Sequence, residues 1–339
     1  MATMQDIADL AGVSKSTVSR ALREDPTLTI QDTTREKIRD CAISLGYQIK
    51  KEKVMRSFGM IAVIHKDTHF LNQLDNSFYF SVRSAMEQYC LDQRYQIAFF
   101  PISYLRDVPR EICGAVVMGN FTYEQQKKID AALRGIPKAF IGKVNYFPER
   151  MDWIRYDVKS CVYLAMDYLK ENHIRSILYL GGKDVEGTPE IYNKRYHFRN
   201  YLKENPQIDC MGEIESIHGA DSGYHMMGEW LRENPRKLPD ALFVSNDPIA
   251  FGALQALYEF GIPVPQKISV ISINGDGPSE TSVPPLTTVD VHTSQMGKEA
   301  IKCILEQLSD RRKVMKEVSF QPEILMRKSV REGKSKVFG

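Results

Sequence analysis

Long apolar runs are missing from this sequence, and their absence excludes a membrane-spanning protein. No stretch approaches the roughly 20 consecutive apolar residues that a transmembrane helix needs. Asp6 and Asp9 lie in the N-terminal segment, where a secretory signal peptide would be apolar. We therefore expect a cytosolic protein without a membrane partner. The 339 residues, 43% of them hydrophobic and 26% charged, are typical of a globular chain of two or three domains.

Cysteine is sparse, and the common catalytic signatures are lacking. The six cysteines lie far apart, form no C-x-x-C pair and have no histidine at metal-ligand spacing. We therefore expect reduced thiols, no disulfide and no metal site. Gly181 and Gly182 follow an apolar run but fit neither phosphate-binding glycine pattern, which indicates a tight turn. Spacing supports no Ser-His-Asp grouping, so we expect neither an enzyme nor a bound cofactor.

An excess of charge of one sign is also nearly absent, because the formal net charge is only +2. This small excess lies entirely in residues 1–56, which hold 10 Lys/Arg and 8 Asp/Glu, whereas the rest of the chain holds 35 of each. Residues 50–56 alone carry a net charge of +3. A basic segment near the N-terminus favours an anionic partner for that part of the chain.

The N-terminal segment contains three helical patterns. Apolar residues recur at helical spacing from residue 4 to residue 11, with Thr3 as N-cap, Asp6 three residues later and Gly12 at the end. A second pattern starts near Ser14 and ends at residue 22. The third runs from residue 32 to residue 45 and is expected to bury Ile38, Ala42 and Leu45. Two short helices joined by a glycine-containing turn are typical of a helix-turn-helix.

The second helix carries its apolar residues on one face and leaves polar side chains outside. Those polar side chains are Lys15, Ser16, Thr17, Ser19 and Arg20. Hydroxyl, ammonium and guanidinium groups can donate to phosphates and base edges in a major groove. The pattern favours DNA binding, although a three-helix protein-interaction bundle with a solvated polar face remains an alternative.

The head closely resembles that of the lactose-repressor/galactose-repressor (LacI/GalR) family of bacterial transcription regulators. The motif D-I-A-x-x-A-G-V-S-x-x-T-V-S-R-x-L is matched at every fixed position within residues 6–22. The resemblance implies operator DNA as partner, with Lys15, Ser16 and Arg20 reading bases. It also implies that Thr3, Thr17, Ser19 and Tyr47 hold phosphates or set the docking.

The segment after Tyr47 departs from this family. Members usually place a Pro-Asn pair there, followed by a hinge helix whose leucine wedges into the minor groove. Residues 48–57 of this chain are about three residues shorter and lack that leucine. Val54 or Met55 could act as a wedge, but we expect Lys50, Lys51 and Lys53 to bind phosphate instead.

From residue 58 onward, short apolar runs alternate with amphipathic helices, as in parallel sheets that are covered on both faces. So many repeats favour an α/β fold of two doubly wound lobes with a cleft between them. The resemblance implies a domain like periplasmic sugar-binding proteins, in which the chain crosses three times between lobes. The expected organisation is a head (1–47), a linker (48–57), lobe one (58–171 and 290–318), lobe two (172–289 and 319–332) and a tail (333–339).

Three polar residues directly follow predicted strands, where ligands of open α/β sheets bind. Asp157, Asn246 and Asn274 each occupy such a position, and each could equally cap a helix. The resemblance favours ligand contacts for all three. It places the family's cleft arginine on Lys194, with Arg195 as a rival one residue away, and a stacking ring on His218. From lobe one we expect His65, Phe78 and Tyr79 to contribute.

Carboxylates, amides and aromatic rings suit a neutral sugar, and the resemblance within the family is greatest to galactose or galactoside repressors. We therefore predict a repressor of a carbohydrate-utilisation operon with galactose or a galactoside as its effector. A nucleobase or a phosphoprotein as effector remains an alternative. The family also implies a homodimer, and the last nine residues, REGKSKVFG, contain no heptads for a higher oligomer.

Overall fold

The computed structural model describes residues 2–22, 28, 30–47, 58–68, 72, 74, 76–143, 151–184, 186, 188–309 and 312–332. These residues form two compact units, Met1–Phe58 and Gly59–Gly339, which are described separately below. The expected linker at 48–57, including Lys50, Lys51 and Lys53, lies outside the described residues, as does the tail at 333–339.

Three helices make up the N-terminal unit: α1 (Met4–Ala11), α2 (Lys15–Leu22) and α3 (Asp32–Ser44). The predicted start of α1 is confirmed, because Thr3 and Asp6 form a reciprocal capping box. The predicted end is confirmed as well, since Gly12 adopts the left-handed conformation at φ 73°. Short-range sequence signals therefore determine where this helix begins and ends.

The core of the head is built from one face of each helix. It consists of Ile7, Ala8, Ala11, Val18, Ala21, Ile38, Cys41 and Ala42. The expected burial of Leu45 was wrong, because α3 ends at Ser44 and the side chain of Leu45 is 37% exposed in the following turn. Tyr47 packs against the core from this part of the chain.

The second unit contains two six-stranded sheets. The first has the order β11-β5-β4-β3-β1-β2 and is parallel throughout; its strands are β1 (Met60–His65), β2 (Gln96–Pro101), β3 (Ile112–Met118), β4 (Lys138–Ile141), β5 (Asp152–Tyr156) and β11 (Glu317–Phe320). The second has the order β12-β10-β9-β8-β6-β7; its strands are β6 (Ser176–Gly182), β7 (Asp209–Ser216), β8 (Ala241–Val244), β9 (Ser269–Asn274), β10 (Thr287–Asp290) and β12 (Glu323–Leu325). Only β12 pairs antiparallel in these two sheets.

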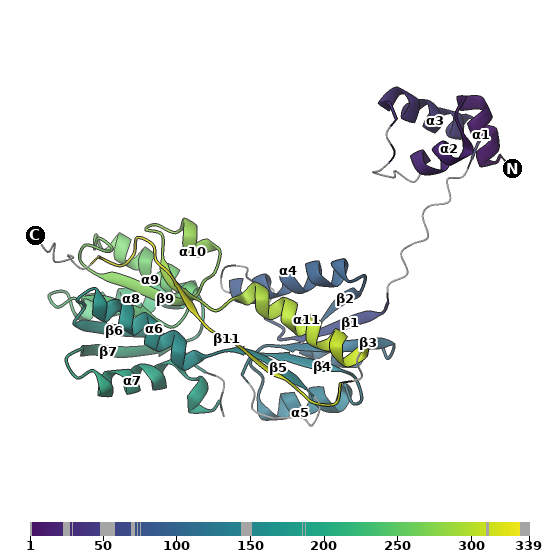
Figure 1. The fold of residues 1–339 in the computed structure, drawn as a ribbon. Coiled ribbons are helices and arrows are strands. Elements are labelled where there is room, and N and C mark those ends of the chain that lie inside the picture. The colour runs from purple at the N-terminus through teal and green to yellow at the C-terminus, as the bar shows by residue number, and fades with distance from the viewer. Residues whose placement is uncertain are drawn as a thin grey trace, which may run out of the picture. The chain divides into compact units, whose positions relative to one another are not determined.

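Helices cover both faces of each sheet. Those of the first lobe are α4 (Ser77–Asp92), α5 (Tyr123–Ala132) and α11 (Thr293–Ser309), with α4 and α11 side by side on one face and α5 on the other (Figure 1). Those of the second lobe are α6 (Val158–Glu171), α7 (Lys194–Glu204), α8 (Ala220–Glu233), α9 (Asp247–Glu259) and the short α10 (Pro278–Thr281). Two 3₁₀ turns, η1 (Ile102–Asp107) and η2 (Glu190–Tyr192), complete the elements.

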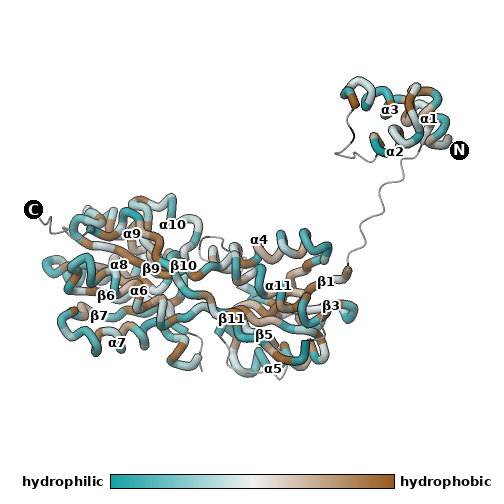
Figure 2. The backbone as a smooth tube through the Cα atoms, in the orientation of Figure 1, coloured by the Kyte–Doolittle hydropathy of each residue, from teal (hydrophilic) through white to brown (hydrophobic). Residues whose placement is uncertain are grey.

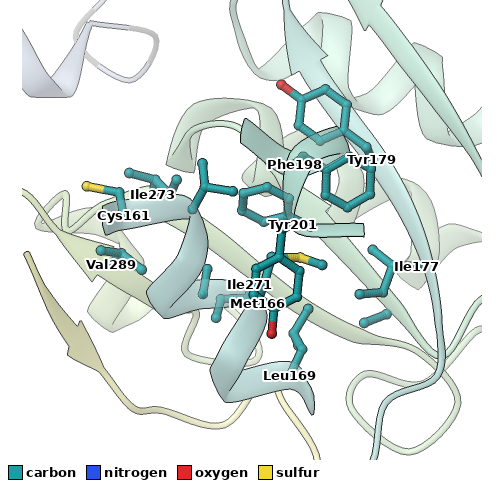
Figure 3. Close-up of a cluster of buried hydrophobic side chains, with 14 of the residues drawn as sticks. Cys161, Met166, Leu169, Ile177, Tyr179, Phe198, Tyr201, Ile271, Ile273 and Val289 are labelled. Carbon is teal, nitrogen blue, oxygen red and sulfur yellow. The ribbon is translucent and has the colours of Figure 1, made fainter. Parts of the chain in front are cut away.

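Alternate residues of the strands enter two separate cores in the second lobe. Ile177 and Tyr179 of β6 pack with α6 and α7, whereas Leu178 and Leu180 pack with α8 and α9. In the first of these cores the rings of Tyr179 and Phe198 stack with centroids 5.2 Å apart (Figure 3). Hydrophobic segments accordingly follow the strands, while the outer turns are more hydrophilic (Figure 2). This arrangement explains why the strands read as uninterrupted apolar runs.

The chain crosses between the lobes after β5, after β10 and after β11. The first crossing differs from the expected boundary at residue 171. Cys161, Val162 and Met166 of α6 pack into the core of the second sheet, so the chain enters lobe two at Asp157. β11 likewise extends lobe one to Phe320 instead of residue 318.

Helices α8 and α9 approach each other closely through two glycines. A Cβ atom at Gly252 would lie 1.8 Å from the carbonyl oxygen of Ala220, and one at Gly223 would lie 2.0 Å from that of Ile249. Only glycine permits such a contact between two helix backbones. Gly252 is the last position of the N-D-x-x-A-x-G pattern at 246–252, so that motif has a packing role as well.

All six cysteines are free thiols. Cys41, Cys90, Cys161 and Cys303 are buried, and Cys210 is exposed. Among the described residues, no helix combines the length and apolarity that crossing a bilayer would require.

Candidate functional site

The polar face of α2 is the first candidate site. Lys15, Ser16 and Arg20 are exposed, and Thr17 and Ser19 are half-buried. Val18 and Ala21 anchor the opposite face in the core of the head. The structure therefore places the predicted base-reading side chains together on one outward surface of a short, well-anchored helix.

The start of α2 is fixed by its own hydroxyl groups. Ser14 Oγ accepts a hydrogen bond from the backbone N–H of Thr17 at 3.0 Å, and the same oxygen lies 2.7 Å from Ser16 Oγ. Because this arrangement satisfies an N–H that the first helical turn leaves free, α2 begins just where its polar row begins.

Two further residues predicted for DNA docking have local structural roles. The Oγ1 atom of Thr3 donates to the carboxylate of Asp6 at 2.9 Å within the capping box. Tyr47 is half-buried against the core of the head. Their expected contacts with phosphate stay predictions, while their contributions to the head are visible in the structure.

The second candidate site is a cleft of about 310 Å³ between the two lobes. Lobe one contributes residues that follow β1, β3 and β4, and lobe two contributes residues that follow β6 and β8 and the start of α7. Six of the nine predicted ligand residues line it: Phe78, Tyr79, Lys194, His218, Asn246 and Asn274.

The structure distinguishes Lys194 from Arg195. Lys194 lines the cleft, where its Nζ donates to the carbonyl oxygen of Ser245 and lies 5.8 Å from the ring centroid of Tyr156. Burial lowers the pKa of Lys194 to about 8. Arg195 instead forms an ion pair with Glu215 at 2.7 Å. Lys194 is therefore the side chain that can meet a ligand.

His218 and Asn246 form a polar pair in the wall of lobe two. The Nδ2 atom of Asn246 lies 2.9 Å from Nδ1 of His218, while Oδ1 of Asn246 accepts from the backbone N–H of Ile249 and caps α9. Desolvation by the surrounding protein is the main cause that lowers the pKa of His218, and the positive charges of Lys194 and Lys143 lower it further. A neutral imidazole beside an amide offers hydrogen-bonding groups to a ligand without adding charge.

Aromatic rings form much of the remaining wall. The centroids of Phe78 and Tyr79 are 5.1 Å apart, and that of Tyr156 lies 6.4 Å from Phe78. Trp153 and Tyr192 meet edge to face at 5.6 Å. All five side chains line the cleft and can cover an apolar face of a bound molecule.

Three predicted ligand residues do not line the cleft: Arg195, described above, Asp157 and His65. Asp157 caps α6, accepting from the backbone N–H of Lys159 at 3.0 Å and from Ser160 Oγ at 2.8 Å. Burial raises the pKa of Asp157, but the hydrogen bonds from Ser160 and Lys159 outweigh this effect and lower it. His65 is buried, with Nδ1 2.7 Å from the carbonyl oxygen of Lys66. The structure thus favours the capping interpretation of Asp157.

Sequence reasoning missed several charged and aromatic residues of the cleft. They are Lys66, Lys143, Trp153, Arg155, Tyr156, Tyr179, Lys183, Asp184, Tyr192 and Glu215. Lys66, Lys143 and Lys183 follow β1, β4 and β6, so the rule that selected Asp157 and Asn246 would have found them. Lys143 of lobe one forms an ion pair with Asp184 of lobe two, which links the two walls.

A second link between the lobes involves a buried carboxyl group. Ser77 Oγ of lobe one donates to Asp276 Oδ2 of lobe two at 2.6 Å, and Oδ1 of Asp276 is buried without a partner among the described residues. Asp247 accepts from the backbone N–H of Asp276 at 2.7 Å. Burial and then the charge of Asp247 raise the pKa of Asp276 to about 7.

This raised pKa predicts a pH-dependent stability. Between about pH 4 and pH 7 the folded state holds more protons on Asp276 than the unfolded state does. The free energy of unfolding therefore falls as the pH rises over this range, and the contribution of protonated Asp276 is lost once the pH passes 7. Relative to Asp276→Asn, the wild type should gain of the order of 2 kcal/mol in unfolding free energy from pH 8 to pH 5. Urea denaturation of both proteins at each pH measures this difference. The exposed Asp107→Asn variant serves as control, and a pH-independent difference for Asp276 would contradict the assignment.

One group of side chains within the described ranges has the spacing of metal ligands. The ligand atoms of Asp290, His292 and Glu323 all lie within 4.8 Å of one another. Asp290 Oδ1 accepts from the backbone N–H of His292 at 2.8 Å, and Oδ2 lies 3.3 Å from its Nδ1 atom. This local pairing accounts for the positions of Asp290 and His292, and the antiparallel pairing of β10 with β12 brings Glu323 opposite Asp290.

Comparison with known families assigns both parts of the chain. Residues 3–49 match the family described as bacterial regulatory proteins, lacI family, and residues 166–330 match the periplasmic binding protein-like domain. The HTH-type transcriptional regulator GalR of Streptococcus thermophilus is 31% identical over 347 residues, covering 98% of this chain and 100% of the relative. GanR of Bacillus subtilis (strain 168) is 30% identical over 341 residues, covering 97% and 100%.

Solved structures share the fold. A transcriptional regulator CelR–cellobiose complex superimposes with a TM-score of 0.69 at 20% identity, covering 97% of this chain and 100% of that chain. The lac repressor dimer bound to operator and the anti-inducer ONPF superimposes with a TM-score of 0.66 at 22% identity, covering 97% and 98%. These similarities confirm the predicted fold, a helix-turn-helix head joined to two periplasmic-binding-protein-like lobes.

Proposed function

This chain belongs to the LacI family of bacterial regulatory proteins, and we propose that it represses a carbohydrate-utilisation operon in response to galactose or a galactoside. It is a DNA-binding transcriptional regulator and not an enzyme. The observation that carries the proposal is the pairing of an exposed polar row on α2 with an aromatic and amide-lined cleft between two lobes.

On the DNA side, α2 enters the major groove with its N-terminal residues foremost. Arg20 pairs through two hydrogen bonds with a guanine, and Lys15 and Ser16 contact neighbouring base edges. Thr17 and Ser19 contact phosphate. The chain acts as a homodimer, whose two heads read the halves of a pseudo-palindromic operator.

On the ligand side, the sugar occupies the cleft between the lobes. Phe78 and Tyr156 cover an apolar face of the ring, while His218 and Asn246 exchange hydrogen bonds with adjacent hydroxyl groups. Support from relatives comes from the CelR structure, which is described as a cellobiose complex.

Ligand and operator are coupled by linkage. A sugar that contacts both walls favours one arrangement of the lobes, and the operator favours one spacing of the two heads. If the sugar and the operator favour different states of the dimer, bound sugar lowers the affinity for the operator. Bound operator then lowers the affinity for the sugar by the same factor, typically 5–150-fold for about 1–3 kcal/mol of coupling.

Fluorescence anisotropy with a labelled fragment from the protein's own promoter tests the proposal. We expect specific binding that weakens at least fivefold with saturating galactose or a galactoside. Glucose, ribose and adenine at equal concentration serve as controls. Release by adenine alone would favour a nucleobase effector, and no binding of any promoter fragment would contradict the function.

A variant of Asn246 tests the ligand site directly. Asn246→Ser keeps an N-cap for α9 but removes the amide that contacts His218, so the fold should persist while sugar affinity falls about tenfold or more. Titration calorimetry gives the dissociation constant, and thermal unfolding verifies the fold. An unchanged dissociation constant would remove Asn246 from the site.

A further inference from the structure

The charges that line the cleft do not balance. Five cationic side chains and two carboxylates face it: Lys66, Lys143, Arg155, Lys183 and Lys194 against Asp184 and Glu215. Both carboxylates already have partners, since Asp184 pairs with Lys143, and Glu215 pairs with Arg195 at 2.7 Å. Arg155 pairs with Glu317 at 2.6 Å. Within the described ranges, these ion pairs leave three ammonium groups without a carboxylate partner.

Lys66, Lys183 and Lys194 are these three, and none of them forms an ion pair with any described residue. Within the described part of the chain, the Nζ atom of Lys194 donates to the carbonyl oxygen of Ser245 and lies over the face of Tyr156. Lys66 is half-buried, and burial lowers its pKa. For Lys66 and Lys194, placing an unpaired ammonium in such surroundings costs free energy that a bound counter-charge would restore, whereas Lys183 is exposed.

The unpaired positive charges lie on both walls of the cleft. Lys66 follows β1 of lobe one, whereas Lys183 follows β6 and Lys194 begins α7 in lobe two. The N-cap residues of α4, α7 and α9, which are Asn76, Asn193 and Asn246, also line the cleft, so three helix dipoles present their positive ends to it. Asp247 and Asp276 are buried behind the wall, where the Asp247 carboxylate accepts from the backbone N–H of Asp276 and both carboxylates accept from nearby hydroxyl groups.

We propose that the effector is an anionic sugar, a monosaccharide that carries a phosphate ester, and that Lys66 and Lys183 contact its phosphate from opposite lobes. The proposal rests on the proposed function and puts a phosphate ester in place of the neutral sugar. A phosphate monoester carries about −1.5 to −2 charges at pH 7 and three acceptor oxygens, to which ammonium groups that line the same cleft can donate. A neutral sugar would supply no counter-charge to any of the three ammonium groups.

The geometry also gives the phosphate a switching role. An anion held between Lys66 and lysines of lobe two draws the walls together, in the same direction as the Lys143–Asp184 pair. The neutral sugar lacks this attraction. The phosphorylated form should therefore both bind more tightly and change operator affinity more strongly than the parent sugar.

Calorimetry with galactose, galactose 6-phosphate, galacturonate and inorganic phosphate tests this inference on the full-length dimer. We expect galactose 6-phosphate to bind at least tenfold more tightly than galactose, with an affinity that falls as ionic strength rises. Inorganic phosphate alone should raise the thermal midpoint relative to chloride at equal ionic strength. Tighter binding of galacturonate than of the phosphate ester would assign the anion to a carboxylate and overturn the phosphate.

The double variant Lys66→Gln/Lys183→Gln should abolish both the preference for galactose 6-phosphate and the effect of inorganic phosphate, with a thermal midpoint in chloride at least as high as that of the wild type. Lys237→Gln/Lys298→Gln removes the same charge from exposed positions outside the cleft and should behave as wild type. Galactose that binds as tightly as its phosphate and releases the operator would overturn the inference but support the proposed function. Failure of every sugar to bind or to release the operator, together with inert phosphate, would overturn both.

Discussion

Replacing Arg20 with alanine is expected to lower operator affinity at least a hundredfold. Arg20 is exposed on α2, whose opposite face is fixed in the core of the head by Val18 and Ala21. A bidentate contact with a base contributes about 1–3 kcal/mol to discrimination, and a dimer makes the contact in both half-sites. Fluorescence anisotropy with the wild-type operator measures the loss.

Two further variants separate base reading from charge. Arg20→Lys keeps the positive charge but cannot form the planar fork, so it should also lose most of its sequence preference. Arg236→Ala removes an exposed arginine from the second unit and should leave operator binding unchanged. Full operator affinity in Arg20→Ala, or a loss equal to that of Arg236→Ala, would contradict the major-groove assignment.

Replacing Gly252 with alanine is expected to lower the free energy of unfolding by about 3 kcal/mol or more. In an ordinary helix interior this change stabilises by about 1 kcal/mol, because alanine is the better helix former. Here the added Cβ would lie 1.8 Å from the carbonyl oxygen of Ala220 and 2.6 Å from the backbone nitrogen of Tyr224, so α8 and α9 must move apart. Urea denaturation followed by circular dichroism measures the change.

Gly228 provides a matched control on α8. A Cβ at this position would approach no atom more closely than 3.8 Å, which is an ordinary van der Waals contact. Gly228→Ala should therefore be neutral or stabilise the protein by up to about 1 kcal/mol. Equal effects of the two substitutions would show that close packing of α8 and α9 is not the cause.

Features determined over a few residues were predictable from the sequence. The capping box of Thr3 and Asp6, the left-handed Gly12 and the polar row of α2 all depend on neighbours within one or two turns. Most strands of the two sheets were predictable too, since burial on both faces requires uninterrupted apolar residues. The lobe boundary at Asp157, expected at residue 171, could not be derived in this way, because only the packing partners of α6 decide which lobe this helix joins.

Features that depend on distant partners were not predictable. β11 and β12 are three or four residues long and have mixed polarity, and they are strands only because β5 and β10 offer free edges. The choice between Lys194 and Arg195 follows from the position of Glu215, some 20 residues away in the sequence. The carboxylate of Asp157 caps its own helix α6, whereas the sequence spacing alone was equally compatible with a ligand contact.

The places of β11 and β12 near the end of the chain set the order in which the protein can be made. Among the described residues, the core of the head includes none beyond Tyr47, so it can close while most of the polypeptide is still unsynthesised. Neither sheet can be completed until residues 317–325 have left the ribosome, because each lobe takes its last strand from that stretch. A nascent chain would therefore fold its DNA-binding head well before its ligand-binding lobes are complete. Truncation before residue 317 would yield a DNA-binding head whose operator affinity no ligand can regulate.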